Sequence, residues 1–150
     1  MFNPDDYQYF CRICDTHVLK NSKHCGKCNR CTYEFDHHCA WVSADIGLLN
    51  YIDFLRMLLG VLATVLVQCG LAVYTLVEVA AQTRRQGDSG LKVGFITVEQ
   101  LRILAWSSLA LSIVAGCLDT YLLVFHYKLI RKNITTLKHL RRKSKKNTRS

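Results

Sequence analysis

The chain has 150 residues, half of them hydrophobic, and a formal net charge of +9 at pH 7. This length allows one domain or one small membrane bundle, and the apolar content excludes a disordered chain. The charge is uneven, because residues 1–56 hold six Lys/Arg and seven Asp/Glu whereas residues 126–150 hold ten Lys/Arg and no acid.

The first ten residues form a short polar lead. They read MFNPDDYQYF, which contains acids and no apolar core, so the lead is not typical of a secretory signal. Pro4 and the two aspartates that follow it favour turn or coil.

Residues 11–51 hold six of the eight cysteines and four of the six histidines. Their order is Cys11-x2-Cys14-x9-His24-Cys25-x2-Cys28-x2-Cys31-x4-Asp36-His37-His38-Cys39. Two CxxC pairs interleaved with histidines bring sulfur and nitrogen donors onto one small surface, as tetrahedral zinc requires. No helical or strand period in this segment is long enough to build a core, so we expect metal to hold it together.

Two apolar segments follow, each long enough to span a membrane. Residues 57–77 form an uncharged run that would be about 31 Å long as a helix, close to the ~30 Å hydrocarbon core. A second run covers residues 103–125, and its one charge, Asp119, is expected to face inward or to lie near an interface. We predict transmembrane helices over 54–81 and 102–125, joined by a lumenal loop over 82–101.

The tail, residues 126–150, is basic and directly follows the second apolar segment. This position favours the anionic cytoplasmic leaflet over nucleic acid as its partner. The loop, counted with Arg102 directly after it, has four Lys/Arg against ten in the tail, so the positive-inside rule places both termini in the cytosol. Cysteines in that reducing compartment favour a metal site over disulfides. The tail is expected to be partly helical and to be disordered beyond about Arg142.

Residues 11–51 resemble, motif by motif, the cysteine-rich domain of the DHHC-type protein S-acyltransferases, or palmitoyltransferases. The resemblance is carried by the run Asp36-His37-His38-Cys39. Four later residues stand where the family usually carries them, namely Trp41, Gly47, Asn50 and Tyr51. Residues 133–138 resemble the family's TTxE motif, with Lys138 at its acidic position.

The resemblance and the apolar segments imply an α-helical integral membrane protein. It has two transmembrane helices and a small zinc-stabilised, loop-rich cysteine-rich domain. Family members usually have two further membrane helices before that domain, which the ten residues before Cys11 do not provide. The acyl pocket would then be open to the bilayer or completed by a partner subunit. Whether the chain is a fragment or a natural short form stays open.

The resemblance also implies two zinc sites with interleaved ligands. By position, one Zn²⁺ takes Cys11, Cys14, His24 and Cys31, and the other takes Cys25, Cys28, His38 and Asp45. Relatives usually carry a cysteine at the position of Asp45. A carboxylate is a legitimate zinc ligand, but a harder one than a thiolate, so we expect the second site to be weaker or more labile. The alternative is that Asp45 is an exposed acid in a turn.

Cys39 is left over once the zinc ligands are counted, and a spare thiol beside a histidine is typical of an activated nucleophile. The resemblance assigns Cys39 as nucleophile, His37 as base and Asp36 as the group that orients His37. It implies acyl transfer from a long-chain acyl-CoA to Cys39, and then to a cytosolic cysteine of a protein near the membrane. The residues that bind acyl-CoA, the protein substrates and the acyl length are not indicated. The sequence also does not indicate whether the membrane is that of the endoplasmic reticulum, that of the Golgi or the plasma membrane.

Two other functions are compatible with the same motifs. One is a catalytically inactive, membrane-anchored zinc module that acts as a scaffold or regulator, which Asp45 and Lys138 favour. The other is nucleic-acid binding through zinc and the basic tail. We do not expect nucleic acid as a partner, because the basic residues directly follow an apolar segment.

Overall fold

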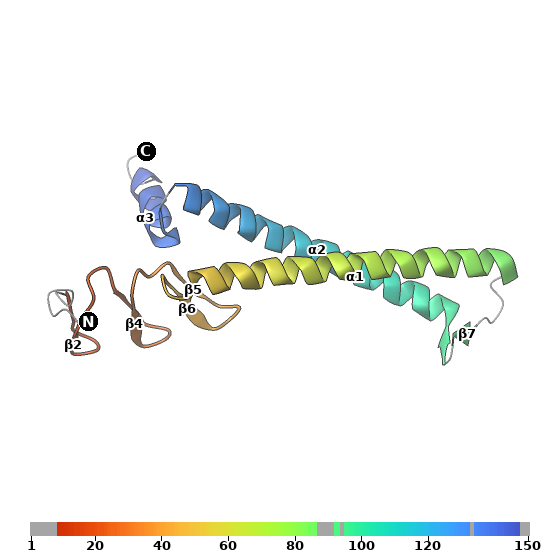
Figure 1. The fold of residues 1–150 in the computed structure, drawn as a ribbon, viewed down its shortest axis with the longest axis horizontal. Coiled ribbons are helices and arrows are strands. Elements are labelled where there is room, and N and C mark those ends of the chain that lie inside the picture. The colour runs from red at the N-terminus through yellow and green to blue at the C-terminus, as the bar shows by residue number, and fades with distance from the viewer. Residues whose placement is uncertain (1–8, 87–91, 94, 133, 148–150) are drawn as a thin grey trace. The chain divides into compact units, whose positions relative to one another are not determined.

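The computed structural model describes residues 9–86, 92–93, 95–132 and 134–147. The chain forms two compact units. Met1–Arg56 and Val124–Ser150 make up the first, which we call the cysteine-rich unit. Met57–Leu123 make up the second, which we call the membrane unit. Figure 1 shows the order of the elements along the chain.

The cysteine-rich unit begins with three antiparallel hairpins (Figure 1). Their strands are β1 (Tyr9–Cys11) with β2 (Thr16–Val18), β3 (Lys23–Cys25) with β4 (Arg30–Thr32), and β5 (His37–Cys39) with β6 (Ala44–Ile46). Each strand has three residues, and equivalent residues recur every 14 positions along the chain. The strands are too short to bury a core between them, as the sequence pattern predicts.

A left-handed residue closes each hairpin turn. Asp15, Asn29 and Ser43 stand just before the second strand, with φ of 50°, 48° and 50°. Asn and Asp adopt this conformation more readily than most other residues. The shared geometry gives all three hairpins the same turn and therefore the same placement of the cysteine that ends the first strand.

A close backbone crossing at Gly47 follows the third hairpin. A Cβ at this position would lie 2.7 Å from the carbonyl oxygen of Tyr33 and 2.8 Å from Cγ2 of Thr32. Asn50 holds the same segment, because its Oδ1 accepts a 2.9 Å bond from the Gly47 N–H and its Nδ2 donates a 2.9 Å bond to the carbonyl oxygen of Asp45. The chain enters the first long helix directly after Asn50.

Two helices, α1 (Tyr51–Gln86) and α2 (Val98–Arg131), are long and apolar enough to cross a membrane. With 36 and 34 residues they measure about 54 and 51 Å, more than the ~30 Å hydrocarbon core. The predicted pair of membrane helices is confirmed. The ranges 54–81 and 102–125 lie inside them, and these bounds stay a prediction.

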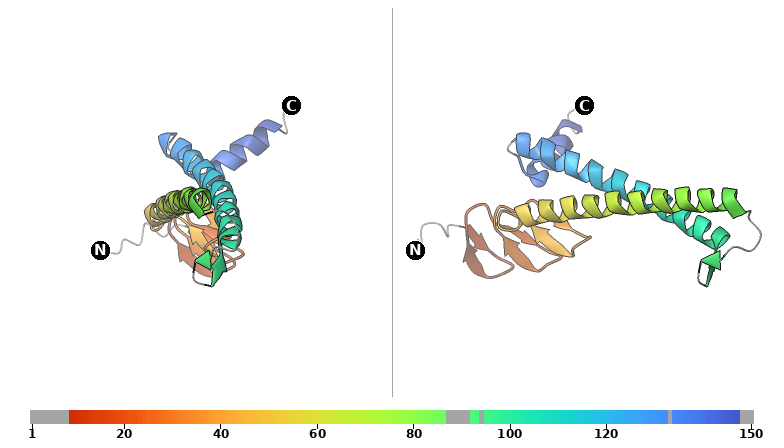
Figure 2. Two further views of the ribbon diagram at one scale, coloured as in Figure 1. Left: turned by 90° about the vertical axis from the view of Figure 1, so that its right-hand side faces the viewer. Right: turned by 45° about the vertical axis from the view of Figure 1, so that its right-hand side comes forward.

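Polar and small residues connect α1 and α2 within the membrane unit. The two views of Figure 2 show this pair of helices from other sides. Gln68 donates a 2.6 Å hydrogen bond to the Ser108 hydroxyl. A Cβ at Gly116 would lie 3.0 Å from Cγ1 of Val65, so the Val65 side chain packs directly over the Gly116 backbone. Asp119 is buried, and its Oδ2 has no hydrogen-bond partner among the described residues.

The predicted loop, 82–101, lies partly outside the described residues. Its described part includes the short strands β7 (Lys92–Val93) and β8 (Ile96–Thr97), which pair with each other. After α2, the tail forms α3 (Thr136–Asn147). The prediction of disorder beyond Arg142 is wrong for the described residues, since α3 continues to Asn147. Lys and Arg are good helix formers, which is consistent with this extension.

The core of the cysteine-rich unit is small and partly polar. Its buried apolar side chains include Phe35, Ile46, Phe54 and Leu129, together with two cysteines, Cys25 and Cys39. Asp36, Asp45 and His126 are also buried. Buried ionisable groups require hydrogen-bond partners or a metal, so these three residues are candidates for a functional site.

We expect Gly47→Ala to destabilise the cysteine-rich unit by about 1–3 kcal/mol, because the new methyl group would overlap a backbone oxygen that cannot move alone. The measurement is the thermal unfolding midpoint of the purified protein in detergent. Gly26→Ala is the matched control, since a Cβ at Gly26 has no atom within 4 Å. Equal midpoints for the two variants would contradict the prediction.

Candidate metal centres and active site

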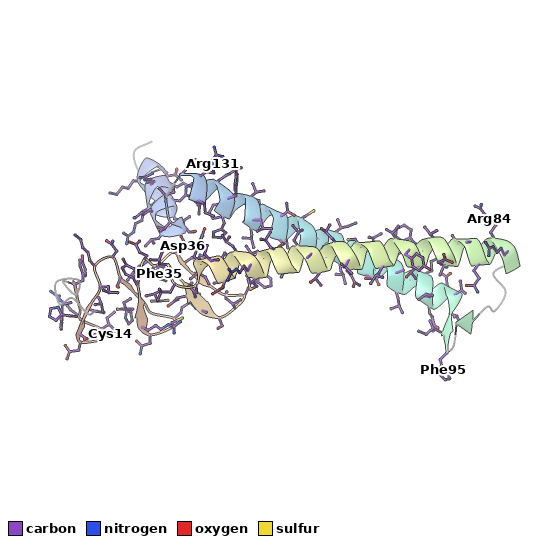
Figure 3. The ribbon with its side chains drawn as sticks, in the orientation of Figure 1. Cys14, Phe35, Asp36, Arg84, Phe95 and Arg131 are labelled. Atoms are coloured by element: carbon purple, nitrogen blue, oxygen red, sulfur yellow. The ribbon has the colours of Figure 1, made fainter. Side chains whose placement is uncertain are left out.

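The first predicted ligand set joins the first two hairpins. Cys11 and Cys14 lie at the turn between β1 and β2, where Figure 3 labels Cys14, and His24 pairs directly with Cys31 across β3 and β4. The four ligand atoms lie within 4.8 Å of one another, and the three Sγ atoms are 3.3, 3.8 and 3.9 Å from Nδ1 of His24. Ligands of tetrahedral zinc, with bonds of about 2.0–2.3 Å, stand about 3.3–3.8 Å apart. The set therefore fits one metal ion.

The charge of this first set also suits a cation. Burial and the neighbouring Cys11 and Cys14 thiols raise the pKa of Cys31 to about 12. Three sulfurs this close cannot all ionise unless a positive charge compensates them, and a coordinating metal deprotonates thiols outright. Soft thiolates with one imidazole are the donors that zinc prefers.

The second predicted set joins the second and third hairpins in the same way. Cys25 and Cys28 lie at the turn between β3 and β4, and His38 pairs directly with Asp45 across β5 and β6. Their ligand atoms also lie within 4.8 Å of one another. Nδ1 of His38 is 3.8 Å from Sγ of Cys25, 3.3 Å from Sγ of Cys28 and 2.9 Å from Oδ1 of Asp45. Both clusters could hold metal ions.

Asp45 is not an exposed turn acid, so that alternative is wrong. Its side chain is 0% exposed, Thr32 Oγ1 donates a 3.2 Å bond to Oδ2, and Nε of Arg30 lies 4.0 Å from the same oxygen. Burial alone would raise the pKa of Asp45, but hydrogen bonds led by those of Cys25 and His38 outweigh it and lower the pKa to about 2. Asp45 is therefore a carboxylate at neutral pH, with Oδ1 directed at the cluster.

The third hairpin repeats the geometry of the first two without completing a ligand set. Cys39 ends β5 as Cys11 and Cys25 end β1 and β3. Val42 stands where the other two turns have their second cysteine. Cys39 is buried and belongs to neither of the two clusters found among the described residues. The hairpin therefore presents one cysteine that has no second turn thiol to chelate a metal with it.

The strand period separates the two adjacent histidines. Successive side chains of a strand point to opposite faces, so His38 faces its partner Asp45 while His37 and Cys39 lie on the other face of β5. His37 donates from Nδ1 to Oδ2 of Asp36 at 2.8 Å. This bond leaves Nε2 as the ring nitrogen that is available for other chemistry.

Asp36, labelled in Figure 3, is buried between His37 and the first residue of α3. Thr136 donates from its backbone N–H to Oδ1 and from its hydroxyl to Oδ2, both at 2.6 Å. Burial alone would raise the pKa of Asp36, but the hydrogen bonds from His37 and Thr136 outweigh it and lower the pKa. Asp36 is therefore an anion that orients His37 and caps α3.

Tyr51, Phe54 and His126 contact the site but were not predicted as site residues. The ring centroids of Phe54 and His126 lie 5.2 and 5.5 Å from that of His37, and the Tyr51 hydroxyl is hydrogen-bonded to Nδ1 of His126 at 3.0 Å. No local spacing indicates His126, because 75 residues separate it from Tyr51. For Thr136 the signal is the TTxE-like motif, although the motif does not identify Asp36 as the partner.

Comparisons with known proteins agree on one family. The family model described as DHHC palmitoyltransferase matches residues 5–143. The chain is 34% identical over 139 residues to probable protein S-acyltransferase 20 of Arabidopsis thaliana, covering 87% of this chain and 19% of that protein. It is 30% identical over 129 residues to probable protein S-acyltransferase 13 of the same plant, covering 85% of this chain and 40% of the relative. Palmitoyltransferase ZDHHC4 of Bos taurus is 46% identical over 54 residues, covering 36% of this chain and 16% of that protein.

The first prediction from this geometry concerns metal stoichiometry. We expect two Zn²⁺ per chain for the purified protein and one for Asp45→Ala, because three ligands hold zinc more weakly than four. Asp45→Cys should keep two Zn²⁺ ions and should release the ion of the second ligand set to a chelator more slowly than the wild type does, since a thiolate is the softer ligand. Metal analysis during chelator titration measures both quantities. Two tightly held ions in Asp45→Ala would show that Asp45 is not a ligand.

The second prediction tests the incomplete third hairpin. Val42→Cys would give this hairpin a CxxC turn that begins at Cys39, like the turns of the other two, so we expect the variant to bind additional Cd²⁺ under reducing conditions. The measurement is the thiolate-to-metal absorption in the ultraviolet during Cd²⁺ titration, with Val42→Ser as the control that adds no second thiol. Identical titrations for the two variants would show that the third turn cannot chelate a metal.

Proposed function

Because the chain belongs to the DHHC palmitoyltransferase family, we propose that it is a protein S-acyltransferase that uses a long-chain acyl-CoA. The chain spans 19% and 40% of the length of the two plant relatives, so the activity of the whole relatives enters as part of this proposal. One observation carries it. Cys39 lies outside both ligand sets, on the same strand face as His37, whose ring is held by the Asp36 anion.

In the first proposed step, Cys39 takes the acyl group. Nε2 of His37 accepts the thiol proton while Sγ of Cys39 attacks the thioester carbonyl carbon of acyl-CoA. The bond from that carbon to the CoA sulfur breaks, and CoA leaves with the proton that His37 returns. The Asp36 carboxylate, 2.8 Å from Nδ1, stabilises the imidazolium that forms between these events.

In the second proposed step, the acyl group moves from Cys39 to a cysteine of a protein substrate. The thiol of the substrate gives its proton to Nε2 of His37 and attacks the thioester carbonyl carbon on Cys39. The bond from Sγ of Cys39 to that carbon breaks, and Cys39 recovers its thiol proton from His37. The same three residues, Asp36, His37 and Cys39, serve both steps, which are chemically symmetric.

We also propose that both ligand sets bind Zn²⁺ and that zinc has a structural role. Each set draws two residues from one hairpin turn and two from the strands of the next hairpin. Bound zinc would join the three hairpins in series and so hold the strand that carries His37 and Cys39. No proton or acyl transfer passes through the metal in this mechanism.

The membrane arrangement is part of the proposal. We place the spans at 54–81 and 102–125, the connecting loop 82–101 on the lumenal side, and both termini in the cytosol. The support is the distribution of charge, with ten Lys/Arg and no acid in residues 126–150. Cys39 would then face the compartment that contains acyl-CoA and protein thiols.

The test is covalent labelling of the purified protein with an alkyne-tagged palmitoyl-CoA. We expect a hydroxylamine-sensitive label on the wild type and none on Cys39→Ser, because a thioester forms only on the thiol. His37→Gln should slow labelling by roughly 10²-fold or more through loss of the base. Cys69→Ser is the matched control, since Cys69 lies in α1 outside both ligand sets.

Metal content is measured on the same samples. A wild type that holds two zinc ions and acquires no label would overturn the proposal and favour an inactive membrane-anchored zinc module. Labelling that survives in Cys39→Ser would assign the acyl group to another residue.

A further inference from the structure

His126 lies near the C-terminal end of α2 and takes no part in the mechanism above, yet it is among the most buried polar residues of the cysteine-rich unit. It is only 3% exposed. Its Nδ1 is hydrogen-bonded to the hydroxyl of Tyr51, the first residue of α1, at 3.0 Å. The pair therefore ties together the start of one long helix and the end of the other, both inside this unit.

The ring of His126 packs on the ring of His37. Their centroids are 5.5 Å apart with an interplanar angle of 37°. Phe54 fills the corner between them, at 4.9 Å from His126 and 5.2 Å from His37, and is nearly perpendicular to both. Phe54 and His126 thus contact His37, and Tyr51 contacts both of them in turn. We call Tyr51, Phe54 and His126 together the His37 wall.

The polar members of this wall are costly residues to place in a core, because the buried imidazole of His126 and the half-buried phenol of Tyr51 both lose hydration free energy. Apolar rings of the same size would pack there without that cost. The hydrogen bond between Tyr51 and His126 fixes the rotation of the His126 ring, which packing alone leaves free to flip. A fixed wall in turn limits the rotation of His37 about its own side-chain torsions.

We propose that Tyr51 and His126 are positioning residues that hold the His37 ring for acyl transfer. Asp36 holds one atom of His37, the Nδ1 nitrogen, and a single hydrogen bond leaves the ring free to swing about it. The His37 wall supplies the second constraint, so that Nε2 keeps one direction while Nδ1 stays on Asp36. This inference rests on the proposed function, in which Nε2 of His37 moves the proton.

The variants separate the hydrogen bond from the packing. Tyr51→Phe keeps a ring and removes the hydroxyl, and His126→Phe keeps a ring and removes Nδ1. His126→Asn keeps a hydrogen-bonding amide near the position of Nδ1, which can pair with the Tyr51 hydroxyl as donor or acceptor. Tyr121→Phe is the matched control, because Tyr121 is an exposed tyrosine of α2 in the membrane unit.

Single-turnover labelling of Cys39 is measured across palmitoyl-CoA concentrations, with zinc content and unfolding midpoint on each sample. We expect Tyr51→Phe and His126→Phe to lower the maximal labelling rate roughly 10- to 100-fold with an unchanged half-saturating concentration, because misplacing the base affects only the reacting geometry. His126→Asn should recover part of the rate lost in His126→Phe. A wild-type maximal rate in both phenylalanine variants, or a loss that follows zinc content, would overturn the inference.

A readout that does not depend on activity separates this inference from the proposed function. In protein labelled with ¹⁵N-histidine, the His37 signals report its Nδ1-protonated tautomer and its environment. We expect Tyr51→Phe to broaden or shift the His37 signals and Tyr121→Phe to leave them unchanged. If the wild type forms no acyl-enzyme, the proposed function fails, and these spectra alone decide the inference. Unchanged His37 signals in Tyr51→Phe would refute it.

Discussion

Strands of three residues make too few hydrogen bonds and bury too little apolar surface to hold a hairpin in water. Three such hairpins make up residues 9–46 of the cysteine-rich unit, so the order of this segment depends on what joins each hairpin to the next. A metal ion held by either ligand set would connect two hairpins, because each set takes two residues from one hairpin turn and two from the next hairpin. The apolar core around Phe35 and Ile46 is small and comes second to these links.

Side chains alternate between the two faces of a strand, so neighbouring residues of β5 belong to different sites. His38 faces Asp45 and the second ligand set, whereas its neighbours His37 and Cys39 face the other way. A one-residue shift of β5 against β6 would exchange these faces and would place His37 instead of His38 in the second ligand set. The pairing of β5 with β6 therefore matters as much as the identity of the residues.

Asp36 connects this arrangement to the end of the chain. Its carboxylate accepts hydrogen bonds from His37 and from both donors of Thr136, so one buried anion orients a ring and caps α3. A negative charge at a helix N-terminus is favourable, since the first N–H groups of the helix have no helical partner. The position of α3 and the orientation of His37 therefore depend on the same group.

The local spacing of cysteines and histidines is sufficient to predict the two clusters that could hold metal ions, and the apolar runs are sufficient to predict two membrane helices. Both are short-range patterns, which chain connectivity alone brings to one surface or one helix. The 14-residue recurrence of Cys11, Cys25 and Cys39 was also present in the sequence and indicates three equivalent hairpins. Asp45 was ambiguous, because spacing cannot distinguish a buried carboxylate from an exposed one.

Tertiary structure decided the rest. It buried Asp45 beside His38, brought Thr136 to Asp36 across 100 residues, and placed His126 against His37 through a hydrogen bond to Tyr51. Contacts between segments this far apart depend on how helix ends pack on the hairpins, and no local period encodes that packing. The sequence by itself therefore determined which donors and which membrane helices the protein has, whereas only the folded chain decided which groups surround His37 and in which direction its ring points.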